Sequence, residues 1–266
     1  MKNKKKKSQI NKFIEKGYAI IKLLNNSEHL KLKKKTVERI NSKIQKKNYL
    51  LTKNIKEYHK LIKSEIDHKK IIRSNRYVKL DPEIKNKISA NKDINNIIKK
   101  YWGHNKFIMK WIGSSLKKNQ IKNNFCGFRI SRPVKIKKLD TAGAHCDIHV
   151  GGRISFDKKI MITAWIPLEG FNKNYTLQLY EGSHINLHPL NKIKERKNSV
   201  SRIFNKSYLK KFKSKRINLK LGESILIHPN LIHGGGENLG TKTRLSVEVR
   251  MYNKKNILKY PVSLRG

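Results

Sequence analysis

Two stretches, Ala144-His-Cys-Asp-Ile-His149 and Leu231-Ile-His-Gly-Gly-Gly-Glu-Asn238, carry the pattern that decides how this chain is built. Alternate side chains of an extended segment share one face, so His145 and Asp147 are predicted to point the same way and Cys146 the other. His233 supplies a second imidazole far downstream. Two imidazoles and one carboxylate are ligands suited to a transition metal, and the pattern predicts a metal site.

Both stretches lie in a half of the chain that is typical of β-structure. Short apolar segments separated by Gly, Pro and Asn predict strands at residues 107–112, 125–130, 160–166, 176–180, 224–228 and 245–251. Strands that follow a helical region predict a mostly β fold with flanking helices. The specific prediction is a double-stranded β-helix, a cupin-like jelly roll, buttressed by N-terminal helices.

The first half predicts those helices. A β-branched strand is expected at residues 18–22, and Ser27 is predicted to cap a helix that runs to about residue 44. Further helical patterns cover residues 54–72 and 83–101, and the Lys-rich residues 192–215 are predicted to be a surface insertion. We interpret residues 1–266 as one domain, in which 1–105 are the helical support, 106–252 the jelly-roll core with the metal site, and 253–266 a tail.

The charge of the chain is extreme but unpatterned. The 266 residues hold 63 Lys plus Arg against 18 Asp plus Glu, a net charge of +45, and Lys outnumbers Arg 51 to 12. Specific nucleic-acid binders use Arg for bidentate contacts and interleave aromatic residues, and neither pattern stands out here. We therefore expect salt-sensitive, non-specific association with nucleic acid and no specific complex.

Other compositional features restrict the class of protein. A content of 37% hydrophobic residues suffices for a core and argues against a disordered basic tail. No apolar run approaches the roughly 20 residues of a membrane span, and the basic N-terminus leads into no apolar segment of a signal peptide. Two cysteines, Cys126 and Cys146, fit a reducing compartment. The expected protein is cytoplasmic, with no membrane partner.

The donor set indicates a chemistry. Two nitrogen ligands and one carboxylate on one face of iron leave three positions open, which is the facial triad of non-haem iron(II) oxygenases. Eleven residues after His233 stands Arg244, followed on the same strand face by Ser246. A fixed cation near the metal is what a dicarboxylate co-substrate needs.

At these residues the chain resembles the iron(II)- and 2-oxoglutarate-dependent dioxygenases, most closely the phytanoyl-CoA dioxygenase-like branch. The ordered set of His145, Asp147, His233 and Arg244 matches its motif. Secondary matches are FIEKGYAII (13–21), FRISRP (128–133), AWIPLEG (164–170) and EGSH (181–184), so that the resemblance spans about residues 10–252. Glu181 departs from the proline usual in the family's turn.

The resemblance implies the cofactors and the reaction. His145, Asp147 and His233 would bind iron(II), Arg244 and Ser246 would hold the 5-carboxylate of 2-oxoglutarate, and dioxygen would be the oxidant. Retention of Asp147 favours hydroxylation or desaturation, because related halogenases need that position vacant. The expected reaction is hydroxylation of a small, polar organic substrate, and no motif specifies which one.

Four further residues are weaker candidates for the site. His149 shares the predicted face of His145 and is interpreted as a neighbour of the substrate, although it could compete as a ligand. Trp165 fits the core better than a cofactor wall. Arg129 and Arg132 could hold the co-substrate or an anionic substrate, and structural salt bridges explain them equally well.

Alternative functions remain open at this point. The Gly234–Gly236 run resembles the oxyanion loop of some esterases, but no G-x-S-x-G nucleophile motif occurs in the chain. A non-catalytic cupin-like protein that binds a metal or ligand is a serious alternative. So is an oxygenase that acts on protein or nucleic acid. The oligomeric state cannot be inferred from the sequence.

Overall fold

The structure of the chain is a computed structural model. It describes residues 8–45, 54–72, 76–112, 121–134, 140, 143–149, 160–186, 188–189, 193–195, 202–234 and 236–253. The helices are α1 (Gln9–Lys16), α2 (Asn26–Gln45), α3 (Tyr58–Leu61), α4 (Glu65–Ile72), α5 (Pro82–Ala90), α6 (Lys92–Trp102) and α7 (Lys206–Leu209), with 3₁₀ turns η1 (Ile55–Glu57) and η3 (Asp147–His149).

Two antiparallel sheets face one another. The large sheet contains β1 (Tyr18–Lys22), β2 (Tyr77–Lys79), β3 (Phe107–Ile112), β4 (Ile121–Asn123), β5 (Phe125–Ser131), β7 (Ile160–Glu169), β12 (Glu223–Ile227) and β14 (Arg244–Asn253). The small sheet has the order β11 (Ser214–Lys215), β8 (Gln178–Tyr180), β13 (His233–Gly234) and β6 (Ala144–His145), and β9 (Ile193–Glu195) pairs with β10 (Arg202–Phe204). The jelly-roll prediction is confirmed.

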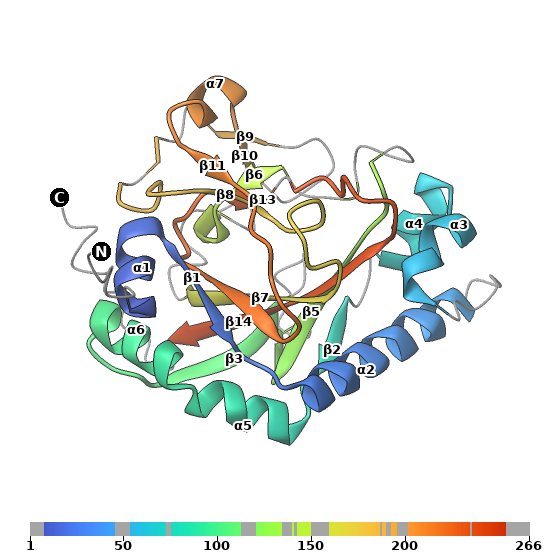
Figure 1. Cartoon of the computed structure of the whole chain (residues 1–266), viewed down its shortest axis with the longest axis horizontal. Helices are drawn as coiled ribbons and strands as arrows, with labels where there is room; N and C mark the ends of the chain where they lie inside the picture. Colours follow the sequence, from blue (N-terminus) through green and yellow to red (C-terminus); the bar gives the residue numbers. More distant parts are fainter. Residues whose placement is uncertain are drawn as a thin grey trace, which may run out of the picture.

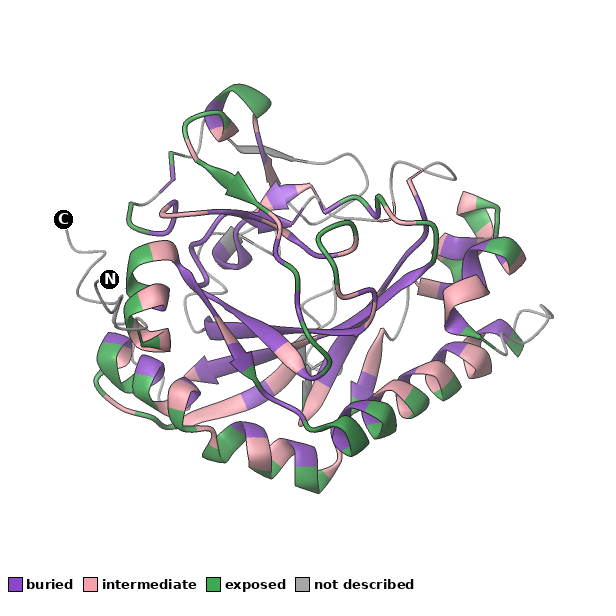
Figure 2. Cartoon of the chain, viewed as in Figure 1, coloured by how far each residue is buried: buried purple, intermediate pink, exposed green. Residues whose placement is uncertain are grey.

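The helices cover the outer face of the large sheet. Helices α1, α2, α5 and α6 lie along it, and the small sheet lies on the other side (Figure 1). Alternation along β14 explains the layering: Leu245, Val247 and Val249 enter one core with helix residues such as Ile40 and Ile97. The strands are largely buried, whereas the outward faces of α2 and α5 are exposed (Figure 2).

The opposite, inner face of the large sheet is polar. Along β14 it carries Arg244, Ser246, Glu248 and Arg250, and the registers place Ser131 opposite Arg244 and Thr163 opposite Arg250. A run of buried polar side chains is costly unless they are paired or hold a ligand. This face therefore marks where the site lies.

Three details of the first half differ from the sequence-based expectation. Helix α2 is capped by Asn25 and not by Ser27, because the Asn25 side chain accepts from the Glu28 N–H (2.8 Å) while Glu28 accepts from the Asn25 N–H (2.7 Å). The helix predicted at 83–101 is broken at Asn91, whose side chain caps α6. The helix predicted at 54–72 is interrupted between α3 and α4.

The Lys-rich segment 192–215, predicted as a surface insertion, also contributes buried side chains. In the described part, Phe204 of β10 and Tyr208 of α7 are buried with Cys146 and Ile232 of the small-sheet region. The segment thus covers the small sheet and supports the strands that carry the candidate ligands. No helix in the described part of the chain is both long and apolar enough to cross a membrane.

Candidate metal centre

The pairing of β6 with β13 brings the two histidines together. His145 lies directly opposite His233 in the antiparallel register, and their ring centroids are 4.7 Å apart. Cross-strand neighbours lie on one face of a sheet, so residues that are far apart in sequence meet here by strand pairing alone.

Backbone carbonyls orient both imidazoles. Nδ1 of His145 lies 2.7 Å from the Gly143 carbonyl oxygen, and Nδ1 of His233 lies 2.9 Å from that of Leu231. A carbonyl only accepts, so each Nδ1 donates its proton and each Nε2 keeps a lone pair. This outer hydrogen bond is the arrangement that prepares a histidine to bind a metal.

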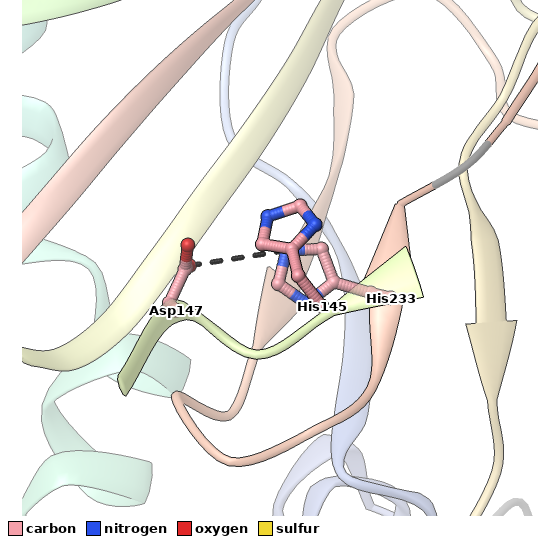
Figure 3. Close-up of side chains that lie close together, drawn as sticks. All are labelled: His145, Asp147 and His233. Atoms are coloured by element: carbon pink, nitrogen blue, oxygen red, sulfur yellow. Dashed lines mark ion pairs between the residues drawn. The ribbon is translucent and has the colours of Figure 1, made fainter. Parts of the chain in front are cut away.

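Asp147 supplies the carboxylate of the group. It begins η3 and is almost fully buried, and its Oδ2 accepts from Thr163 Oγ1 (2.5 Å) while its Oδ1 accepts from Arg250 Nη2 (3.2 Å). Asp147 Oδ2 lies 3.9 Å from His233 Nε2, and the ligand atoms of all three residues lie within 4.8 Å of one another (Figure 3). The prediction of one extended face was wrong in detail, since Asp147 lies in a 3₁₀ turn, yet it converges with His145.

The electrostatics suit ligand binding. Burial alone would raise the pKa of Asp147, but Arg250, His233 and His145 outweigh it and hold that pKa below its ordinary value. Burial, followed by repulsion from His233, lowers the pKa of His145 to about 4. At neutral pH the group therefore offers a carboxylate and a neutral imidazole, the forms in which these residues bind metals.

A glycine is required beside the histidines. Gly234 has φ +100°, and a Cβ there would lie 2.8 Å from His145 Nδ1. At Gly236 a Cβ would lie 2.7 Å from the Thr176 carbonyl oxygen. The Gly234 and Gly236 positions thus allow close backbone approach around the site, which explains two of the three glycines without an oxyanion loop.

A second polar group lies at the start of β14. Arg244 is buried, and its Nη1 donates to the carbonyls of Tyr175 (2.7 Å) and Gly236 (2.8 Å). Among the residues that the structure describes, its Nε has no hydrogen-bond partner, and neither do the buried hydroxyls of Ser246 and Ser131. Unsatisfied buried donors around a guanidinium form a cradle that a carboxylate would fill. Burial, then repulsion from Arg216, lowers the pKa of Arg244 to about 10, so it stays charged.

Comparison with known proteins identifies the family. The family model "Phytanoyl-CoA dioxygenase (PhyH)" matches residues 13–246. The chain belongs to the phytanoyl-CoA dioxygenase family. A search of curated proteins finds no matching sequence. Membership confirms the predicted enzyme class, an iron(II)- and 2-oxoglutarate-dependent dioxygenase, and the predicted cofactors, iron, 2-oxoglutarate and dioxygen.

Solved structures with the same fold are distant in sequence. EctD from S. alaskensis with 2-oxoglutarate and 5-hydroxyectoine has a TM-score of 0.54 at 14% identity, covering 98% of this chain and 81% of that one. The carbocyclase SnoK of nogalamycin biosynthesis has a TM-score of 0.53 at 12% identity, covering 94% and 85%. The epimerase SnoN with Fe3+, alpha ketoglutarate and nogalamycin RO has a TM-score of 0.53 at 13% identity, covering 92% and 82%.

The weaker candidates from the sequence occupy different places in this family fold. Trp165 is buried in an apolar cluster with Leu179 and Ile225. The η3 turn ends at His149, whose side chain lies outside the described part. Arg129 lies on the inner face and pairs with Glu248 (3.0 Å).

Arg132 has a structural environment. Its Nε and Nη2 donate to the two oxygens of Asp140 (both 2.8 Å), and its Nη1 donates to the carbonyls of Ile62, Lys63 and Ser64. Those three carbonyls belong to the break between α3 and α4. Arg132 therefore holds this break against the end of β5, and its donors are committed there.

Sequence reasoning missed three polar residues next to the ligand cluster. Thr163 and Arg250 hold Asp147, and Glu248 lies between Arg129 and Arg250. For Glu248 and Arg250 the available signal was the alternation of polar residues at positions 244, 246, 248 and 250 with apolar residues between them.

Proposed function

We propose that this chain hydroxylates a small, polar organic molecule, with His145, Asp147 and His233 as the iron ligands and the whole chain acting as a single oxygenase domain. The observation that carries the proposal is the convergence of two imidazole nitrogens and one carboxylate oxygen within 4.8 Å, from the paired strands β6 and β13 of the small sheet and the turn that follows β6. The donor set suits iron(II) and leaves open positions for a co-substrate and dioxygen.

The co-substrate site is assigned to Arg244 and Ser246. The unpaired Nε of Arg244 and the hydroxyl of Ser246 match the 5-carboxylate of 2-oxoglutarate, and Ser131 stands opposite Arg244 on the neighbouring strand. Because Nη1 is held by two carbonyls, the guanidinium is oriented before any ligand arrives. Preorganisation of this kind reduces the entropy lost on binding.

Iron with 2-oxoglutarate, when bound, supplies the oxidising chemistry: oxidative decarboxylation to succinate coupled to hydroxylation of a C–H bond. The residues of the chain orient the candidate metal ligands and exclude water. Carbonyls of Gly143 and Leu231 orient the histidines, and Thr163 and Arg250 orient Asp147. Asp147 and His233 are buried, so bulk water is kept from the carboxylate and one imidazole.

A small substrate fits the relatives whose structures share this fold. EctD was solved with 5-hydroxyectoine and SnoN with nogalamycin RO, both small molecules. These likenesses support a small substrate for this chain.

The deciding experiment is oxygen-dependent succinate production by the iron(II)-loaded protein from 2-oxoglutarate, without any macromolecule. We expect slow, iron-dependent turnover, and loss of both turnover and iron binding in Asp147→Ala and His233→Ala. His149→Ala should keep iron, since His149 is assigned beside the substrate. Iron binding without succinate in the wild type would favour the non-catalytic alternative, and turnover only with added protein or nucleic acid would favour a macromolecular substrate.

A further inference from the structure

A second charged cluster lies on the inner face of the large sheet, outside the assigned ligands. Glu248 Oε2 accepts from Nη2 of Arg129 (3.0 Å) and lies 3.6 Å from Nη2 of Arg250. The same Arg250 nitrogen reaches Asp147. The Glu248 carboxylate is therefore shared by the guanidinium groups of Arg129 and Arg250, and Arg250 also contacts the candidate metal ligand Asp147.

More positive charge gathers around this pair. Arg76 precedes β2, which pairs with β5, and repulsion from Arg129, followed by burial, lowers the pKa of Arg76 to about 9. Among the described residues, the Arg76 side chain makes no hydrogen bond or ion pair. Lys110 of β3 stands opposite Arg250 in the register, on the same face. Clustering of like charges is costly inside a protein unless a counter-charge arrives.

In the described part of the chain, this face carries more positive than negative charge. Iron(II), Asp147, doubly ionised 2-oxoglutarate and Arg244 would together be neutral if both histidines are neutral. Arg76, Arg129 and Arg250 against Glu248 then leave two positive charges in excess, without counting Lys110.

Solvent reaches Arg129 and Glu248 of this cluster more than it reaches the ligand Asp147. The side chain of Arg129 is 27% exposed and that of Glu248 16%, whereas Arg250 is 5% and Asp147 2% exposed. Three contacts connect Arg129 to the metal ligand: Arg129 with Glu248, Glu248 with Arg250, and Arg250 with Asp147. A molecule that pairs with Arg129 would thus lie on the inner face that also carries Arg250, the partner of Asp147.

We propose that Arg129, with Arg76 and Arg250, binds the anionic group of the substrate, so that the molecule hydroxylated by this chain is a small carboxylate or phosphate. The proposal rests on the proposed function, because it takes the iron and 2-oxoglutarate sites as assigned. Arg129 is favoured as the direct contact because it is the exposed member of the cluster. Guanidinium groups bind carboxylates and phosphates alike, through pairs of parallel hydrogen bonds.

The test is isothermal titration of the anaerobic iron(II)–2-oxoglutarate holoenzyme with matched probes. The anions are inorganic phosphate, glycerol 3-phosphate and benzoate, and the uncharged counterparts are glycerol and benzamide. We expect at least one of the three anions to bind, and we expect neither glycerol nor benzamide to bind measurably. Arg129→Gln should weaken that anion at least ten-fold, Arg129→Lys should weaken it less, and Lys99→Gln, which removes an exposed charge on α6, should leave it unchanged.

A parallel titration of 2-oxoglutarate, followed by its charge-transfer absorbance with iron(II), separates the possible failures. Its affinity should change less than three-fold in Arg129→Gln. A large loss would assign Arg129 to the co-substrate and overturn the proposal. No anion binding, or equal weakening by Lys99→Gln, would also overturn it. Absence of the charge-transfer band in the wild type would instead contradict the proposed function.

Discussion

Arg250 on the last strand of the large sheet donates to Oδ1 of Asp147, which belongs to the turn after the small-sheet strand β6. This contact joins the two sheets at the candidate metal centre. Thr163, opposite Arg250 in the register, donates to the other oxygen of the same carboxylate. The large sheet therefore orients a ligand whose two partners lie on the small sheet.

The first prediction concerns Thr163. Thr163→Val removes one hydrogen bond to Asp147 with little change of shape, and loss of such an outer contact typically costs about 10–100-fold in metal affinity. Calorimetric titration of the apo-protein with iron(II) or cobalt(II) measures it. Thr176→Val is the matched control, because Thr176 is equally buried but bonds to the Ile217 backbone. Equal metal affinity in Thr163→Val and wild type would remove the positioning role.

The second prediction concerns Arg244. Losing a charge-assisted contact in a buried site costs about 2–5 kcal/mol, which is at least ten-fold in affinity. Arg244→Ala should lose more 2-oxoglutarate affinity than Arg244→Lys, which keeps a charge but not the planar donor pair. Iron binding should be retained in both. A 2-oxoglutarate titration of Arg244→Ala that superimposes on wild type would contradict the assignment.

The third prediction concerns acid sensitivity. Burial lowers the pKa of His184 to about 4, below the ordinary value near 6.5 that it regains on unfolding. The unfolded chain therefore binds a proton first as the pH falls, so stability is complete above pH 6.5 and declines toward pH 4, by about 3 kcal/mol from this residue. Urea unfolding of the metal-free protein across this range measures the slope.

His184→Gln isolates that contribution. Glutamine can still donate to the Ile14 carbonyl, which His184 Nε2 contacts at 3.0 Å, but it does not titrate. The variant should show a shallower decline between pH 6.5 and 4. His104→Gln serves as the control, since His104 is only partly buried. Parallel profiles for His184→Gln and wild type would show that His184 does not drive the acid sensitivity.

The fourth prediction concerns Arg132 and Asp140. Both side chains are almost fully buried, and removing one partner leaves an uncompensated charge at a cost of about 3–5 kcal/mol. Arg132→Met should destabilise the protein by this amount in urea unfolding. The double variant Arg132→Met with Asp140→Asn should lose less than the two single variants added together. Additive losses would mean that the pair is not coupled.

The segment around Asn25 shows where local patterns misled. Ser27 and Asn25 both suit a helix cap, and the choice depends on the reciprocal bond between Asn25 and Glu28. The break between α3 and α4 could not be predicted locally, because its exposed carbonyls are satisfied by Arg132 from a distant strand.

The sequence by itself determined the order of helices and strands, the alternation that builds two-faced strands, and the residue types suited to a metal and a dicarboxylate. These depend on local periodicity and on side-chain chemistry, which are written in the chain. Only the tertiary structure decided which side chains meet. Strand pairing set His145 against His233, a 3₁₀ turn brought Asp147 to them, and the inner face of the large sheet placed Thr163, Arg250 and Arg129 beside them. Such contacts arise from pairing between strands that are distant in sequence, and local periodicity gives the face of each side chain without giving the partner strand.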